Sequence, residues 1–162
     1  MVRETLGDVL NAEAEIIAHQ TNCMGVMGAG VALQIKNKLL SADEFKKYET
    51  LCKMKDADEL LGTVQYLNAE NGKLIANVFG ENIPTGTGLD TDYRALQEGL
   101  QSVHDYASDI GASVAIPGLM GCGLAGGDWN IVRKMIEDIF GDSEVSLEIV
   151  FFLEEDYNNW VK

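Results

Sequence analysis

The sequence has little positive charge. Its 162 residues include 12 lysines and arginines against 26 aspartates and glutamates, which gives a net charge of −14. A protein that binds a nucleic-acid backbone needs a basic stripe to displace counterions, and this composition does not favour one. The same acidic excess disfavours docking on an anionic membrane. The composition therefore argues against large polyanionic partners, and a small anion would have to bind against the field of the whole protein.

Long apolar runs and closely spaced cysteines are also lacking. The longest apolar run, 149–153, is far too short to span a bilayer. The chain begins Met-Val-Arg-Glu, without the apolar stretch of a secretion signal. Its three cysteines, Cys23, Cys52 and Cys122, are an odd number at wide spacing. We therefore expect a cytoplasmic protein with reduced thiols, no bound metal, no cofactor and no membrane association.

No linker, repeat or low-complexity segment interrupts the chain. A chain of this length buries roughly 70% of its unfolded surface as one domain, so we expect a single domain over residues 1–162. Short β-branched runs alternate with segments of helical periodicity, which predicts an α/β fold. The run 114–116 is apolar without alternation, as in a largely parallel or mixed sheet covered on both faces. The predicted strands are 2–6, 15–19, 63–67, 74–79, 113–116 and 146–153, and the predicted helices are 31–39, 42–52, 93–107 and 129–139.

Local signals set some of these boundaries. Ser41 followed by Glu44 predicts a capping box at the start of the second helix. Asn71-Gly72 predicts a turn between two paired strands. The residues after 153 form a short acidic and aromatic tail with no predicted element.

Two glycine-rich loops are the most informative features of the sequence. One covers 20–30 and the other 118–128, and each leads from a predicted strand into a predicted helix. Glycine lets a backbone come within bonding distance of a ligand, and amides at a helix N-terminus bind anions without a basic side chain. Neither loop contains lysine or arginine. Because both loops follow strands, they would face one crevice of the sheet and could clamp a diphosphate.

The second loop also permits a different interpretation. Residues 121–126 match G-x-G-x-x-G, the signature of nicotinamide dinucleotide enzymes. In those enzymes the signature stands near the start of the unit and directly after a strand, whereas here it begins at residue 121. A dinucleotide oxidoreductase is therefore a weaker alternative, and a simple set of tight turns is another.

Several polar residues near the loops could take part in chemistry. His19 and Cys23 could form a nucleophilic pair, although a buried histidine and an inert thiol are the simpler interpretation. Asp128 precedes a helix, so it is expected to cap it, but a carboxylate there could also activate water. Asp8 is expected in a turn, where it could accept a hydrogen bond from an exocyclic amine.

Three segments together resemble the macrodomain family of ADP-ribose-binding proteins. They are Gly7-Asp8-Val9, the run from Ile16 to Ala32 that contains His-Gln-Thr-Asn-Cys-Met-Gly, and the run from Ile116 to Trp129 that contains Pro-Gly-Leu-Met-Gly-Cys-Gly-Leu. Their order and spacing match over nearly the whole chain. The sequence is most similar to the branch of terminal ADP-ribose-protein glycohydrolases and DNA-ADP-ribosylation antitoxins. The resemblance implies a three-layer α/β/α fold around a mixed, largely parallel sheet.

The resemblance also implies roles for individual residues. Asp8 would pair with the adenine amino group, and the Val9 backbone would lie beside it. Asn22 and the loop 28–31 would hold the distal ribose and a phosphate, and 121–124 would hold the diphosphate. Asn22 and Asp128 could together orient and deprotonate water. The expected substrate-binding residues are Asp8, Val9, Gln20, Asn22, Gly28, Ala29, Gly30, Val31, Pro117, Gly121, Cys122, Gly123 and Leu124.

The sequence departs from that branch at its catalytic positions. The branch uses a lysine in the loop after the central strand, and this chain has none at 80–88. Ala125 and Ala29 stand where related enzymes carry an aspartate and a lysine. A mechanism through a lysine adduct is therefore not expected.

These departures leave two main functions open, beside the oxidoreductase. One is hydrolysis of an ADP-ribose derivative, such as ADP-ribose 1''-phosphate or an ADP-ribosyl ester, and the other is ADP-ribose binding without catalysis. The expected partner is ADP-ribose or an ADP-ribosylated small molecule or protein. Nucleic acid is not expected, and the sequence leaves the oligomeric state open.

Overall fold

One twisted sheet organises residues 1–161, which are the residues described by the computed structural model. Within this range six strands follow the order β1-β6-β5-β2-β4-β3, and all neighbouring pairs are parallel except β3 with β4. The strands are β1 (Val2–Leu6), β2 (Ile16–Asn22), β3 (Val64–Asn68), β4 (Leu74–Glu81), β5 (Val114–Pro117) and β6 (Leu147–Phe151).

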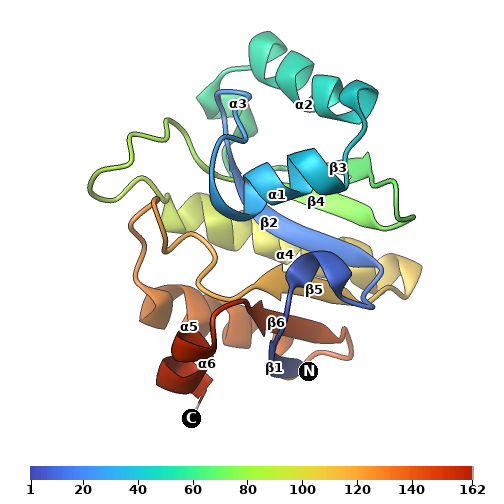
Figure 1. Ribbon diagram of the computed structural model, residues 1–162, viewed down its shortest axis with the longest axis vertical. Helices are drawn as coiled ribbons and strands as arrows, with labels where there is room; N and C mark the ends of the chain where they lie inside the picture. The colour runs from blue at the N-terminus through green and yellow to red at the C-terminus, as the bar shows by residue number, and fades with distance from the viewer. Residues whose placement is uncertain (162) are drawn as a thin grey trace.

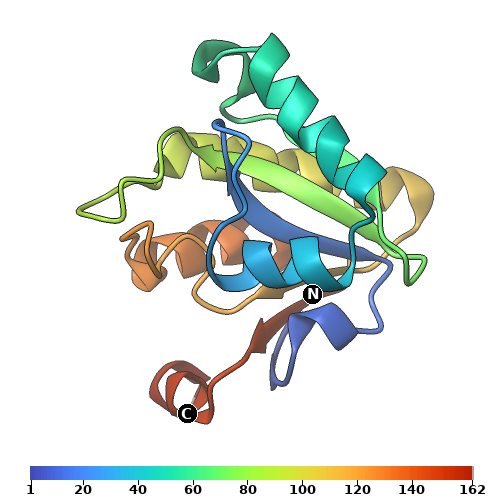
Figure 2. The same cartoon turned by 45° about the horizontal axis from the view of Figure 1, so that its top comes forward.

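Helices cover both faces of this sheet, as Figures 1 and 2 show. One buried cluster joins the sheet to α4 and α5, and another joins its opposite face to α1 and α2. The expectation of a three-layer α/β/α fold with a mixed, largely parallel sheet is confirmed. The helical elements are η1 (Val9–Asn11), α1 (Gly30–Lys38), α2 (Ala42–Met54), α3 (Ala57–Leu60), α4 (Tyr93–Ile110), α5 (Trp129–Phe140) and α6 (Glu154–Val161).

Side-chain caps set several of the helix starts. Asp92 accepts a hydrogen bond from the Ala95 amide (3.0 Å) at the start of α4. Ser41 accepts one from Glu44 (3.2 Å), as the sequence predicts. The other half of that capping box is missing, because the Glu44 carboxylate binds Lys47 and the Asn68 amide instead.

The predicted strands and long helices are all present, with small shifts at their ends. The Asn71-Gly72 turn joins β3 to β4, as predicted. Residues 154–161 form α6, although no element was predicted there. Its Tyr157 and Trp160 pack against the core beside α5, which stabilises a helix that its acidic sequence alone does not indicate. No helix in the described part of the chain is long and apolar enough to cross a membrane.

Candidate functional site

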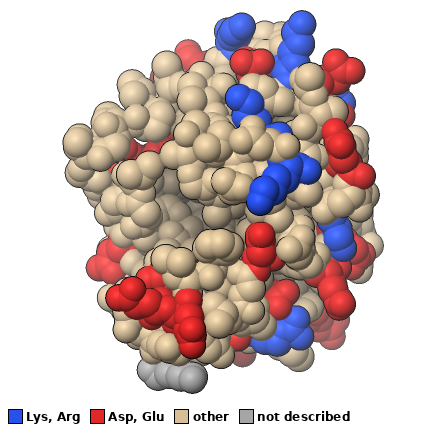
Figure 3. Space-filling view, in the orientation of Figure 1, with Lys and Arg blue, Asp and Glu red and all other residues tan. Residues whose placement is uncertain are grey.

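A groove lies at the carboxyl ends of β2, β4 and β5. It consists of two adjoining hollows of about 330 and 450 Å³, which share Gly30, Val31, Pro117 and Gly118 in their walls. Figure 3 shows the surface hollowed on this face and few charged groups around the hollow. The larger hollow lies beside η1 and the end of β6, and the smaller one lies between the two glycine-rich loops. The sequence-predicted crevice is therefore a real feature of the surface.

Asn22 shapes the first loop from the last position of β2. Its side-chain oxygen accepts hydrogen bonds from the amides of Met24 (3.0 Å) and Val26 (3.4 Å), and its nitrogen donates to the Val26 carbonyl (2.7 Å). The Tyr48 hydroxyl of α2 binds the Asn22 backbone and side-chain oxygens at 2.7 and 3.1 Å. Asn22 is almost completely buried and lines the smaller hollow, with one side-chain N–H left for a ligand.

The first loop leads directly into α1. Ala29 at the N-cap has no side-chain hydrogen bond to the helix, so its alanine side chain leaves the first amides uncapped. Gly28, Ala29, Gly30, Val31 and Ala32 all line the smaller hollow. The N-terminus of α1 is thus open toward the groove.

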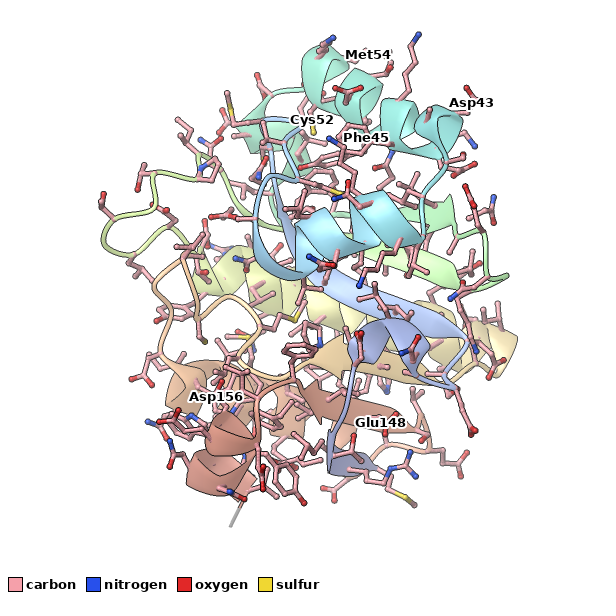
Figure 4. The ribbon with its side chains drawn as sticks, viewed as in Figure 1. Asp43, Phe45, Cys52, Met54, Glu148 and Asp156 are labelled. Atoms are coloured by element: carbon pink, nitrogen blue, oxygen red, sulfur yellow. The ribbon has the colours of Figure 1, made fainter. Side chains whose placement is uncertain are left out.

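Helix α2 supports this loop from behind. Figure 4 shows Phe45 and Cys52 on α2, above α1 and the loop. A Cβ atom added to Gly25 would lie 3.5 Å from the Cβ atom of Cys52, so the loop backbone packs closely on α2. The Lys36 ammonium lies 4.4 Å from the ring centroid of Phe45, which joins α1 to α2.

The second loop is held to the segment that follows β4. The Ala125 carbonyl accepts hydrogen bonds from the amides of Asp90 (2.8 Å) and Thr91 (3.1 Å). A Cβ atom added to Gly126 would lie 1.9 Å from the Gly88 carbonyl oxygen, so only glycine permits this approach. The loop 118–127 therefore forms one wall of the groove, and the segment 82–91 packs against this wall from outside.

Gln20 links that wall to the central strand. Its side-chain nitrogen donates to the Thr91 hydroxyl (2.9 Å), which in turn donates to the Gly121 carbonyl (2.7 Å). The Gln20 oxygen is buried without a hydrogen-bond partner among the described residues. Gln20 therefore ties the second loop to β2 and to Thr91 from below the groove.

The other end of the groove lies between η1 and the end of β6. Asp8 and Val9 line it, and the Asp8 carboxylate accepts the Leu10 amide (3.0 Å), as expected of a turn aspartate. Phe152 lines the same hollow with 73% of its surface exposed. Sequence reasoning missed Phe152 because it placed the residue inside the strand 146–153, whereas β6 ends at Phe151.

Most of the residues expected to bind substrate come together in this groove. Cys122 is an exception, since its thiol donates to the Met120 carbonyl (3.3 Å) and does not line either hollow. Burial, followed by the charge of Asp128, raises the pKa of the Cys122 thiol to about 12. The expected residues that line the groove are Asp8, Val9, Gln20, Asn22, Gly28, Ala29, Gly30, Val31, Pro117, Gly121, Gly123 and Leu124.

Asp128 also lies outside the groove lining. Its carboxylate accepts the Asn130 amide (2.9 Å) and caps α5, and its own amide donates to the Tyr93 hydroxyl (2.9 Å). The simpler of its two expected roles, the cap, is therefore the one that its contacts support.

His19 and Cys23 do not form a nucleophilic pair. His19 is completely buried and contacts the Asn77 side-chain oxygen (2.7 Å), and burial lowers its pKa to about 4. Burial, together with the nearby Cys52 and Glu81, raises the pKa of the Cys23 thiol to about 11. Both groups are therefore uncharged at neutral pH, and a neutral buried thiol is a poor nucleophile. No cluster of potential metal ligands occurs among residues 1–161.

Glu81 is a groove residue that the sequence did not reveal. It ends β4 and lines the smaller hollow beside Asn22. Burial, followed by the charge of Asp90, raises the pKa of its carboxyl group. The sequence shows that the segment 80–88 lacks a lysine. A single glutamate among 26 acidic residues, however, gives no indication of a functional role.

A sheet with helices on both faces and a glycine-walled groove at its carboxyl edge defines an α/β ligand-binding domain. The sequence model of the Macro domain family matches residues 18–136, which include both glycine-rich loops. The chain therefore belongs to the Macro domain family, and the resemblance seen in the sequence is confirmed.

Known proteins of this family resemble the chain over most of its length. A DNA ADP-ribosyl glycohydrolase of Mycobacterium tuberculosis is 30% identical over 143 residues, which are 86% of this chain and 39% of the relative. The macrodomain of Mycobacterium tuberculosis DarG is 25% identical with a TM-score of 0.79, and the match covers 95% of this chain and 99% of that one. Thermosipho africanus DarTG in complex with ADP-ribose is 22% identical with a TM-score of 0.72, covering 91% and 40%. This chain spans about two fifths of the length of the curated relatives that it matches.

Proposed function

We propose that the chain binds ADP-ribose in the groove and hydrolyses the bond between the distal ribose and an attached group. The continuous groove from Asp8 to Asn22 is the observation that carries this proposal. Its two hollows share a waist at Gly30 and Gly118, which suits a diphosphate between two nucleoside-sized ends.

Each part of ADP-ribose has a matching part of the groove. The adenine lies beside Phe152 with its amino group toward Asp8, since an exposed aromatic ring and a carboxylate suit a purine. The diphosphate lies between the α1 N-terminus and the loop 121–124, where backbone amides bind its oxygens. The distal ribose lies at Asn22, whose free N–H donates to a ribose hydroxyl.

The names of the relatives support the second half of the proposal. A glycohydrolase that removes ADP-ribosyl groups from DNA is related over 86% of the chain. That activity is at odds with the expectation, drawn from the charge of −14, that nucleic acid is not a partner. The charge argument concerns binding to a phosphate backbone, whereas a modified base needs only to reach the groove.

Exposed lysines near the groove make a DNA substrate more compatible with this acidic protein. Figure 3 shows blue side chains gathered over α1 and α2, and Lys38 lines the larger hollow. We therefore add an ADP-ribosylated oligonucleotide to the expected substrates, ADP-ribose 1''-phosphate and ADP-ribosyl esters.

Binding and turnover can be tested separately. Calorimetry with ADP-ribose, AMP and NAD measures binding, and we expect ADP-ribose to bind more tightly than either of the others. An NAD affinity at or above that of ADP-ribose would instead support the oxidoreductase. Turnover is measured by release of ADP-ribose from an ADP-ribosylated single-stranded oligonucleotide, from ADP-ribose 1''-phosphate and from a glutamate-ADP-ribosylated peptide. Release from at least one of them is expected.

A binding module without catalysis is the second candidate. It is favoured by the missing lysine in 80–88 and by the contacts of Asp128, which point to helix capping. Tight ADP-ribose binding with no release from all three substrates would support this alternative.

A further inference from the structure

Glu81 is held at a fixed position beside the part of the groove assigned above to the distal ribose. It is the last residue of β4, and the parallel register places it next to Asn22 of β2. On its other side its backbone forms a bridge with Thr91, and the neighbouring Asn82 carbonyl accepts the Cys23 amide (3.1 Å). The backbone that carries this carboxylate is therefore anchored on both sides.

The Glu81 carboxylate makes no contact that would give it a role in stabilising the fold. Among residues 1–161 it takes part in none of the side-chain hydrogen bonds and ion pairs, although it is half-buried in the groove lining. Other carboxylates nearby are occupied: Asp90 accepts the Thr85 hydroxyl (2.6 Å) and the Gly86 amide (2.9 Å), and Asp128 caps α5. A groove carboxylate without a protein partner is free to contact a ligand or a water molecule.

We propose that Glu81 is the general base that deprotonates the attacking water in the hydrolysis proposed above, on which this inference rests. The water oxygen forms a bond to C1'' of the distal ribose, and the bond between C1'' and the attached group breaks, with its electron pair leaving on that group. Glu81 takes the proton of the water, and the departing group takes up a proton from Glu81 or solvent. The products are ADP-ribose and the protonated leaving group, so atoms and charge balance without a further reactant.

The surroundings of Glu81 suit a base at neutral pH. Burial disfavours its charged form, and the negative charge of Asp90 adds to this effect, so its pKa lies above the ordinary value. The titratable groups that interact electrostatically with Glu81 are Asp90, Cys23 and Tyr48, and of these only Asp90 is charged at neutral pH. A carboxylate with a raised pKa accepts a proton more readily than an ordinary carboxylate does.

The sign of the pH dependence follows from the base form being the active one. The rate is full above the pKa of Glu81 and falls as the pH drops through it. Removing the charge of Asp90 lowers the pKa of Glu81, so in Asp90→Asn the acidic limb of the rate profile moves to lower pH.

The test compares the wild type with Glu81→Gln, which keeps the size of the side chain and removes the base. With the substrate that the wild type releases fastest among the three named above, kcat falls by about 100-fold or more. The Kd for ADP-ribose, measured by calorimetry, stays unchanged, and the acidic limb is absent from the residual rate. Asp90→Asn is the comparison variant: it keeps the Glu81 base, so it retains turnover at pH 8 while its acidic limb moves to lower pH. Thermal unfolding of each variant checks that it is folded.

Three results would overturn the assignment in different ways. Full turnover by Glu81→Gln removes Glu81 from catalysis and leaves the proposed hydrolysis intact. Lost ADP-ribose binding in a folded Glu81→Gln makes Glu81 a binding residue instead. An absence of turnover by the wild type on all three substrates overturns the hydrolysis itself, and the base with it.

Discussion

Asp8 and Phe152 lie at the end of the groove where adenine is expected. Replacing Asp8 with alanine removes an acceptor for the adenine amino group, and we expect ADP-ribose binding to weaken by about 1.5–3 kcal/mol, or roughly 10- to 150-fold. Calorimetry with ADP-ribose and AMP measures the change, and both ligands are affected because both contain adenine. The affinity for ribose 5-phosphate, which has no adenine, serves as the control. Unchanged ADP-ribose affinity would remove Asp8 from the site.

Phe152 permits a second test at the same end. Because its ring is 73% exposed, Phe152→Ala is expected to leave the stability of the fold unchanged. It weakens ADP-ribose by about 1–3 kcal/mol if the ring stacks on adenine. Leu153→Ala is the matched control, since Leu153 is also exposed but does not line the groove. Equal affinities of the two variants would argue against stacking.

Individual site residues were predicted from the sequence to different degrees. The glycine pattern between strand and helix indicated the two loops, and the family resemblance indicated Asn22 and Gly123 within them; both residues line the groove. Phe152 and Glu81 were missed because their position depends on where β6 and β4 end, to within one residue. Asp128 was predicted from the sequence, but its role was not. A position directly before a helix suits both a helix cap and a general base, and only the contacts of the side chain show that it caps α5.

At the scale of elements, the contact between Gly126 and the 82–91 segment is the tightest in the site. Gly126→Ala would place a Cβ atom 1.9 Å from the Gly88 carbonyl oxygen at a backbone φ of +75°. We expect the variant to lose about 1–3 kcal/mol of stability, as overpacked sites do. Thermal or urea unfolding measures the loss.

Gly123 provides the matched control in the same loop. A Cβ atom added there meets nothing within 4 Å, so Gly123→Ala is expected to unfold like the wild type. The larger Gly123→Val keeps the fold but abolishes ADP-ribose binding, because its side chain fills the groove where backbone amides approach the diphosphate. If Gly126→Ala were as stable as Gly123→Ala, the two segments would not form the close contact described above.

The elements themselves were largely predictable because their periodicity reflects burial. Helix α4 repeats buried residues at Leu96, Leu100 and Val103, and β5 is buried throughout. Short elements were not predictable in this way. Helix α3 has four residues and starts with the capping box of Asp56 and Glu59, and η1 has three. Such lengths are below the period that a sequence pattern needs.

At the scale of the whole molecule, the net charge of −14 opposes the approach of a diphosphate. The repulsion acts over distance, whereas the amides of the groove act only at contact. Salt shortens the screening length from about 30 Å at 0.01 M to about 8 Å at 0.15 M. We therefore expect the association rate of ADP-ribose to rise with ionic strength, and stopped-flow measurements check it. A falling rate would mean that local positive potential, such as that of Lys38, dominates the encounter.

The hydrogen bonds of the Ala125 carbonyl have a consequence for how the groove wall opens. The amides of Asp90 and Thr91 belong to a segment that is exposed for most of its length, yet they are bonded to a carbonyl more than thirty residues away in sequence. Deuterium can replace their protons only when the two segments separate. We expect these two amides to exchange slowly and at the same rate, and we expect bound ADP-ribose to slow their exchange further. Their exchange rate would then report how often the two segments separate in the intact protein.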